Sequence, residues 1–518
     1  MKKKAITLFF LFCVFNLYAQ STYIPDDNFE QALIDLGYDV GPLDDFVETE
    51  NIINLTNLDL HEKNISSLEG IEEFLKIEEL DISDNQITIL DLSKNTALKV
   101  LDCSINDLEE LDVTGNVLLI ELYCASNSIA VLELGPLSEL KRLDISDNQL
   151  NDLDVFQNTS LESILASNNT IRGIDLTENS ALKTLDVSKN FISFLEVDAN
   201  SNLEALYCSN NLLRTLNLSD NPALDDLICS ENDLTEIDVT QNPLLRRIDI
   251  SLNHITSIDV TANEILARLH VSMNEIGEMD VTQNTALDYL GVNDNHLDYI
   301  DLSKNTTLSI LEAQENQIVF LDLSDNPELI HVDCSKNLIT ELDLTKNLTL
   351  TNLLASNTML TALDLSSNVM LQYLTVLNTP SLSCIQVVNV DAAMANPNYV
   401  VDNTISFSGN CIHPTNSIVN IPGGGTIQSF TSGVSSERLA ESITIFPNPV
   451  VSTLNIESET PVIHVVIYST LGKKVKEIKS GFNAIPLDIL PEGIYIIRIE
   501  VESGSITKKL IKSDVPKS

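Results

Sequence analysis

Basic residues are scarce in this chain of 518 residues, which has 29 Lys and Arg against 76 Asp and Glu and a formal net charge of −47. A negative field of this size repels the phosphates of nucleic acids and of anionic membrane surfaces. The composition therefore excludes both as partners, and it favours cations or basic proteins. The imbalance ends near Ile443, because residues 443–518 carry 9 basic and 8 acidic side chains. This change in charge predicts a domain boundary.

Sequence motifs for catalysis and metal binding are also missing. The chain has no phosphate-binding glycine loop, no nucleophile elbow, no HExxH zinc motif and no Cys-x-x-Cys pair. Only 7 histidines occur. His254 and His296 share a repeat position two coils apart, but the sequence offers no carboxylate pattern that completes a site around them. We therefore predict no enzyme activity, no cofactor and no dedicated metal site, with Ca²⁺ bound by stacked carboxylates as an alternative.

Apolar runs long enough to span a membrane are absent after the first 20 residues. Residues 1–20 contain three lysines, an apolar run and a small residue before a polar boundary. This order is typical of a secretory signal peptide, here cleaved after Ala19 or Gln20. The apolar run is shorter than the roughly 20 residues that a membrane-spanning helix needs. We therefore expect an exported mature chain with no transmembrane segment.

One short phrase is abundant. L-D-I-S-D-N begins at Leu80, and variants of it recur as far as Leu374 with starts alternately 10 and 11 residues apart. The tract consists of fourteen coils of 21 residues. Each coil holds a first phrase, as at Leu80, and a second phrase, as at Leu90. A strict period of this length indicates a solenoid.

The residue pattern of the phrase predicts how the coils stack. Positions one and three are apolar and alternate with outward positions, as in a short strand. Position six is Asn in 26 of 29 phrases, and an inward Asn amide can satisfy the backbone groups of a turn. Residues 98–106, LKVLDCSIN, resemble the leucine-rich repeat core LxxLxLxxN, with Cys103 at an apolar site. A second strand phrase replaces the helical segment of commoner repeats, so the resemblance implies a β-rich solenoid with two parallel sheets.

The ends of the solenoid need caps, because the first and last coils have an exposed apolar face. Residues 26–28 are helix N-cap types, an apolar helical face follows from Phe29 to Leu36, and Gly37 ends the helix. We predict a signal peptide at 1–20, a helical N-terminal cap at 21–57, the solenoid at 58–383, a C-terminal cap at 384–411, a Gly- and Ser-rich linker at 412–442 and a small domain at 443–518.

The cysteines fall into two groups. Those at the inward third position of first phrases are Cys103, Cys124, Cys208, Cys229 and Cys334. We interpret them as small buried apolar residues, although the pairs 103/124 and 208/229, one coil apart, leave disulfides conceivable. Cys384 and Cys411 lie just beyond the last phrase of an exported chain, so we predict that their disulfide closes the C-terminal cap.

The second residue of each phrase points outward and distinguishes the two faces. In second phrases it is acidic in 13 of 14 cases, whereas in first phrases it is varied and includes aromatic residues. A uniform charged face suits solvation, while a varied face with aromatic and Arg side chains suits ligand recognition. The candidate ligand-binding residues are Tyr207, Ile228, Arg247, Arg268, His270 and Tyr289, with Arg247 expected beside Arg268. The alternative is an ordinary mixed sheet whose arginines only offset neighbouring acids.

Residues 443–512 contain short β-rich runs separated by turn residues, which predicts a β-sandwich. They resemble the type A C-terminal sorting domain of type IX secretion, and the residues that carry the resemblance include Pro447, Asn448, Pro449, Gly472, Gly493 and Tyr495. The six residues after Lys512 are longer than the family pattern usually allows. The resemblance implies passage across the outer membrane of a Gram-negative bacterium by the type IX secretion machinery, followed by surface attachment or release.

Together these features predict a secreted, cell-surface-displayed protein that binds a protein or glycan ligand in adhesion or recognition. A structural surface-coat protein without a specific ligand is the alternative.

Overall fold

The computed structural model describes residues 20–411, 443–458, 461–469, 474–501 and 504–513. The chain divides into two compact units, Met1–Leu234 and Thr235–Ser518, which are described in turn. The predicted signal peptide, the predicted linker and Gly472 lie outside the described residues.

The first unit begins with a small cap. Strand β1 (Ser21–Tyr23) pairs antiparallel with β2 (Phe46–Glu48). Helix α1 (Asp27–Asp35) lies between the two strands in sequence, and helix α2 (Thr49–Ile52) follows β2. The Asp26 carboxylate accepts the N–H of Phe29 at 3.0 Å, as a helix N-cap does, and its other oxygen accepts the N–H and hydroxyl of Ser66. Gly37 follows the helix at φ +81°, a left-handed conformation that favours glycine. The predicted helix is confirmed, and Asp26 ties it to the first coil.

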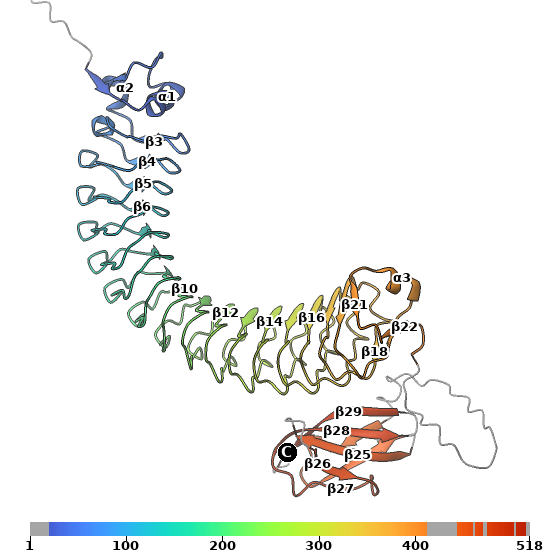
Figure 1. Ribbon diagram of the computed structural model, residues 1–518. Helices are drawn as coiled ribbons and strands as arrows, with labels where there is room; N and C mark the ends of the chain where they lie inside the picture. Colours follow the sequence, from blue (N-terminus) through green and yellow to red (C-terminus); the bar gives the residue numbers. More distant parts are fainter. Residues whose placement is uncertain (1–19, 412–442, 459–460, 470–473, 502–503, 514–518) are drawn as a thin grey trace, which may run out of the picture. The chain divides into compact units, whose positions relative to one another are not determined.

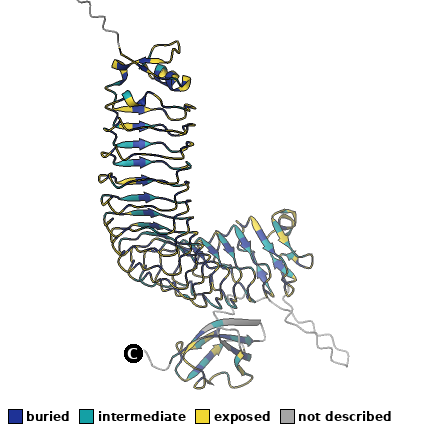
Figure 2. Cartoon of the chain, turned by 60° about the vertical axis from the view of Figure 1, so that its left-hand side comes forward, coloured by how far each residue is buried: buried dark blue, intermediate teal, exposed yellow. Residues whose placement is uncertain are grey.

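Nine parallel strands follow in this unit, each 3 residues long and each formed by a first phrase. They are β3 (Asn57–Asp59), β4 (Glu79–Asp81), β5 (Val100–Asp102), β6 (Glu121–Tyr123), β7 (Arg142–Asp144), β8 (Ser163–Leu165), β9 (Thr184–Asp186), β10 (Ala205–Tyr207) and β11 (Asp226–Ile228), with the 3₁₀ helix η1 (Ile71–Glu73) after β3. Neighbouring strands pair in register, for example Leu101 with Leu122. The middle residue of each strand is buried, and its two neighbours are intermediate or exposed (Figure 2).

The second unit repeats this arrangement. Its main parallel sheet contains β12 (Arg247–Asp249), β13 (Arg268–His270), β14 (Tyr289–Gly291), β15 (Ile310–Glu312), β16 (His331–Asp333), β17 (Asn352–Leu354), β19 (Tyr373–Val376) and β21 (Tyr399–Val401). Helix α3 (Val390–Ala395) precedes β21. A second parallel sheet joins β18 (Leu363–Asp364), β20 (Cys384–Gln386) and β22 (Ser406–Ser408). The leucine-rich repeat solenoid with 21-residue coils is confirmed.

Inward asparagines hold the coils together. In the first phrase, Asn106 donates from Nδ2 to the Ile82 carbonyl of the preceding coil at 2.9 Å and accepts the N–H of Ile87 at 3.0 Å. In the second phrase, Asn116 donates to the carbonyls of Leu92 and Asn95 at 3.1 and 3.0 Å. These bonds satisfy turn carbonyls that burial would otherwise leave unpaired. The predicted Asn ladder is therefore present in both phrases.

The second sheet is shorter than the sequence suggests. Among the described second phrases, regular strand geometry is limited to β18 and to an isolated bridge between Asp91 and Asp112. The other second phrases contain turns, and in most of them the side chain at position two accepts the backbone N–H two residues later, as Asp280 does from Thr282.

The C-terminal domain of the second unit has its own core. One sheet joins β23 (Ile443–Phe446), β24 (Thr453–Ser458) and β27 (Ile485–Pro486), and the other joins β26 (Lys474–Ile478), β25 (Val462–Ser469), β28 (Gly493–Val501) and β29 (Gly504–Lys512). Ile443 and Leu454 of the first sheet are fully buried in one cluster with Ile467 and Ile497 of the second. Two sheets on a shared core are the predicted β-sandwich.

Across the described ranges, no helix combines the length and the apolar character that crossing a membrane requires.

Candidate functional site

The predicted binding residues lie on the outward face of the first-phrase strands, two of them in the first unit and four in the second. In the first unit, Tyr207 on β10 pairs in register with Ile228 on β11. The Tyr207 hydroxyl donates to Asp226 Oδ2 at 2.9 Å, so the ring is held across the neighbouring strand. The two residues are therefore neighbours, as predicted.

In the second unit, Arg247 on β12 pairs with Arg268 on β13, and Arg268 pairs with Tyr289 on β14. The expected side-by-side position of the two arginines is confirmed. Arg268 Nε lies 3.7 Å from Asp288 Oδ1, with 62% of the Arg side chain exposed. An ion pair this exposed contributes little to stability.

Four side chains form a connected row across strands β12 to β15. His270 Nδ1 lies 3.2 Å from Asp249 Oδ2, and the Tyr289 hydroxyl donates to Glu312 Oε2 at 2.7 Å. The rings of His270 and Tyr289 meet edge to face, with centroids 5.8 Å apart. This geometry is favourable for aromatic pairs. The row therefore presents fixed aromatic and polar groups at the surface.

The missing side chain of Gly291 makes room for this row. A Cβ atom at Gly291 would lie 2.7 Å from His270 Cδ2 and 2.8 Å from the Tyr289 hydroxyl oxygen. Both distances are too short for real contacts, so any larger residue would displace one ring. The sequence predicted His270 and Tyr289 as binding residues and placed Asp249 and Gly291 at outward positions without a role, whereas Glu312 was missed. The available signal for Glu312 was that it too occupies the outward second position of a first phrase.

Titration properties in the row follow from its contacts. Burial alone would raise the pKa of Asp249, but hydrogen bonds from His270 and Ser251 lower it overall. The hydrogen bond to Asp249 raises the pKa of His270 against the opposing effect of burial. Burial, followed by the bond to Glu312, raises the pKa of Tyr289. Asp249 and His270 thus form an ion pair at mildly acidic pH, while Tyr289 stays neutral.

The uniform acidic row of second phrases has a structural cause that the sequence analysis missed. The Asp280 carboxylate accepts the backbone N–H of Thr282 at 2.9 Å and its hydroxyl at 2.7 Å. The same backbone contact joins Asp91 to Ser93, Asp112 to Thr114, Asp175 to Thr177, Asp238 to Thr240, Asp259 to Thr261 and Asp343 to Thr345. These acids therefore stabilise turns as well as carrying solvated charge. The Ser or Thr that follows most of them two residues later was the sequence signal for this turn contact.

Among the described residues, no three His, Cys, Asp or Glu side chains form a group that could hold a metal ion.

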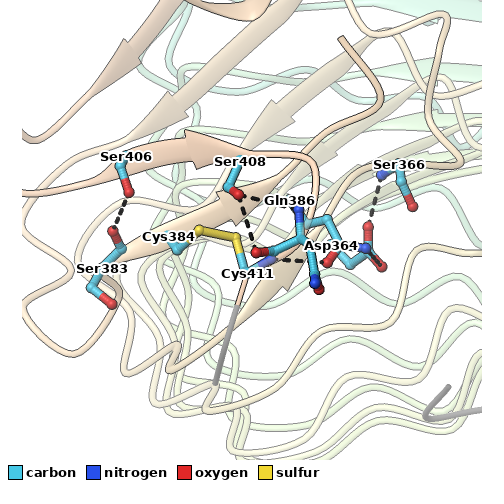
Figure 3. Close-up of a disulfide and its surroundings, with 9 residues drawn as sticks. Asp364, Ser366, Ser383, Cys384, Gln386, Ser406, Ser408 and Cys411 are labelled. Carbon is cyan, nitrogen blue, oxygen red and sulfur yellow. Dashed lines mark hydrogen bonds between the residues drawn. A yellow bond between two sulfur atoms is a disulfide. The ribbon is translucent and has the colours of Figure 1, made fainter. Parts of the chain in front are cut away.

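The C-terminal cap is closed by the disulfide between Cys384 and Cys411, whose Cα atoms are 5.8 Å apart (Figure 3). Gln386 Oε1 accepts the N–H of Cys411 at 3.3 Å, and Gln386 Nε2 donates to Asp364 Oδ2 on β18 at 2.8 Å. The predicted disulfide is confirmed, and it links Cys411 to strand β20.

None of the five cysteines of the first phrases forms a disulfide, and all five are buried, as interpreted from the sequence. Burial raises the pKa of the Cys334 thiol to about 12 and also raises that of Cys103. The Cys103 and Cys334 thiols therefore stay protonated and pack as small apolar groups.

The motif residues of the C-terminal domain have structural contacts. Asn448 Oδ1 accepts the N–H of Ile511 at 2.7 Å, and the peptide bonds preceding Pro447 and Pro449 are cis. Tyr495 is buried and donates from its hydroxyl to the Pro491 carbonyl at 3.0 Å. Gly493 has φ +151°, which favours glycine. The motif thus joins the segment after β23 to the last strand, β29.

Comparison with known proteins agrees with this description. Residues 444–513 match the family of secretion system C-terminal sorting domains, and residues 356–377 match a leucine-rich repeat. Among curated proteins, none matches the chain.

Solved structures with the same architecture include bacterial repeat proteins. The functional domain of InlJ from Listeria monocytogenes, described as including a cysteine ladder, is 28% identical, with 96% of this chain and 99% of that chain covered and a TM-score of 0.62. A leucine-rich repeat protein of Leptospira interrogans is 22% identical, covers 68% and 97% of the two chains and has a TM-score of 0.61. The internalin InlF of Listeria monocytogenes is 21% identical, covers 65% and 98% and has a TM-score of 0.54. At these identities the last two show the fold alone.

Proposed function

Because this chain joins a bacterial leucine-rich repeat solenoid to a secretion system C-terminal sorting domain, we propose that it is exported by type IX secretion and displayed on the surface of a Gram-negative bacterium. There the solenoid binds a protein or glycan ligand through the outward face of its first-phrase strands, in adhesion or recognition. The mature protein is either attached to the outer membrane or released.

The observation that carries this proposal is the row of Asp249, His270, Tyr289 and Glu312 beside Arg268. Ordered aromatic and Arg side chains are the groups that most often anchor interfaces, because they bury a large area at a small cost in conformational entropy. Here Tyr289 is held by Glu312 and by His270 before any ligand arrives. Such preorganisation lowers the entropic cost of binding.

Binding should depend on this row. An array of glycans and extracellular proteins probed with the mature chain would identify a ligand. For that ligand, we expect Arg268→Ala and Tyr289→Ala each to raise the dissociation constant at least about fivefold, a loss of binding free energy on the order of 1 kcal/mol. Biolayer interferometry with immobilised ligand measures this effect.

The chain supplies a matched control for these variants. Asp280→Asn removes one charge from the acidic row while keeping a turn acceptor, because Asn217 at the same position accepts the N–H of Ser219 at 3.2 Å. We expect Asp280→Asn to leave binding unchanged, whereas Asp280→Ala would also disturb the turn. If the Arg268 and Tyr289 variants bind as well as Asp280→Asn does, the first-phrase sheet is not the binding site.

The second candidate, a surface-coat protein without a specific ligand, is favoured by the acidic row, which is uniform and occupied by turn contacts. Two results together would support the surface-coat function. The array would show no saturable binding, and a strain that lacks the protein would have an altered cell-surface layer.

A further inference from the structure

A patch of exposed apolar side chains lies between the first and second phrases in the first unit. Phe191, Phe194 and Leu212 are 53, 63 and 48% exposed, although the equivalent positions elsewhere are mostly polar. Large contiguous apolar surfaces are uncommon on soluble proteins and mark interaction sites. The patch is separate from the outward strand positions, so it is independent of the function proposed above.

Hydrogen bonds between coils fix the arrangement of the patch. The N–H of Phe191 donates to the Ile171 carbonyl, and the N–H of Leu212 donates to the Ile192 carbonyl, both at 2.9 Å. Phe191 and Leu212 therefore occupy the same place in adjacent coils. Three residues at the ninth position from the phrase start, Arg172, Ser193 and Arg214, are stacked in the same way.

A shallow open pocket of about 380 Å³ lies here, lined by Arg172, Phe191, Ser193 and Leu212. Neither Arg172 nor Arg214 makes a side-chain hydrogen bond or ion pair with another residue in the described ranges. Two uncommitted guanidinium groups are unexpected on a chain with 76 acidic residues. From a coil spacing of about 4.8 Å, they stand roughly 10 Å apart on either side of Ser193.

We propose that this patch binds a peptide segment that presents an aromatic or large aliphatic side chain beside carboxylate groups. The apolar side chain would lie against Phe191 and Leu212, and the carboxylates would pair with Arg172 and Arg214, which can bind them in bidentate fashion. A neutral glycan fits less well, because it has no carboxylate to pair with the two guanidinium groups. Repulsion from distant acids is screened beyond about 8 Å at physiological ionic strength.

The chain contains no tryptophan, which allows a clean test. Phe194→Trp places the single indole of the protein at the patch. We expect acetyl-Glu-Ala-Phe with a free terminal carboxylate to change its emission in a saturable way, with a dissociation constant of about 1 mM or lower. Arg172→Gln, Arg214→Gln and Phe191→Ser, each combined with the reporter, should weaken binding at least about fivefold. Calorimetry with the natural Phe194 checks that the indole does not create the site.

Matched controls are available in the same unit. Arg142→Gln changes an arginine that is paired with Glu121, and Phe156→Ser changes a Phe that is 47% exposed in a second phrase. Both should leave the titration unchanged, and circular dichroism should report folded protein for every variant. The proposal is overturned if the peptide gives no saturable response, if acetyl-Gln-Ala-Phe-amide binds equally well, or if the patch variants behave like the controls. Tighter binding of phenyl phosphate would overturn the assignment of the anion as a carboxylate.

Discussion

At the scale of single residues, each first phrase has a left-handed residue at position five, just before the residue that is Asn in most phrases. Ile105, Leu252 and Met273 all have φ between 55° and 56°, although none of them is a residue type that favours this region. The fifth position is therefore dictated by the path of the coil and not by its own side chain. The sequence indicated the Asn ladder because Asn recurs at position six, but position five varies so widely that its conformation could not be predicted.

This strain predicts a stabilising substitution. Ile105 is β-branched and 53% exposed, so it gains little from burial while it adopts the left-handed conformation. Because Asn visits that region more readily, we expect Ile105→Asn to stabilise the fold by about 1 kcal/mol. Thermal unfolding followed by circular dichroism measures the shift. Asn357→Ile, the reverse change at φ 54°, should lower the unfolding midpoint, and equal midpoints for both variants would refute the argument.

At the scale of elements, the two phrases of a coil look alike in sequence and fold differently. Both carry apolar residues at positions one and three, which predicted two sheets of similar extent. Asp112 accepts the backbone N–H of Thr114 at 2.9 Å, but Asp102 accepts that of Ser104 at 3.0 Å in a first phrase that forms a strand, so this contact does not decide which phrase becomes a strand. Periodicity reports which side chains face inward, but it does not report whether backbone groups pair with a strand or with a side chain.

The C-terminal cap gives a prediction for an element. Cys384 and Cys411 are 27 residues apart in sequence, and closing a loop of this size stabilises by about 3–4 kcal/mol in the chain-entropy description. We expect Cys411→Ser to release the end of the cap and to make the segment around α3 sensitive to protease. Limited proteolysis with mass spectrometry locates the cleavage. Wild-type protein under reducing conditions should give the same fragments, and a protected segment in both samples would contradict the prediction.

At the scale of the whole molecule, the sequence predicted more about class than about contacts. A period of 21 residues was sufficient for the solenoid, and four short motifs were sufficient for the sorting domain. Half of the candidate row was predicted, because His270 and Tyr289 follow from outward periodicity, as do Arg247 and Arg268 beside the row. The partners Asp249 and Glu312 depend on side-chain rotation across strands, which no one-dimensional pattern contains. The domain boundaries, including the linker at 412–442, stay predictions.

Export provides the prediction that concerns the complete chain. The C-terminal domain has a buried core of its own, and the solenoid ends in a cap closed by its own disulfide. Deleting residues 443–518 should therefore leave the solenoid folded while removing the signal for passage across the outer membrane. We expect the truncated protein to accumulate in the periplasm with its Cys384–Cys411 disulfide formed, and to be absent from the cell surface. Protease shaving of intact cells, followed by fractionation, measures both, with a deletion of residues 514–518 as the control that keeps every described strand. Surface exposure of the truncated chain would show that the C-terminal domain is not the export signal.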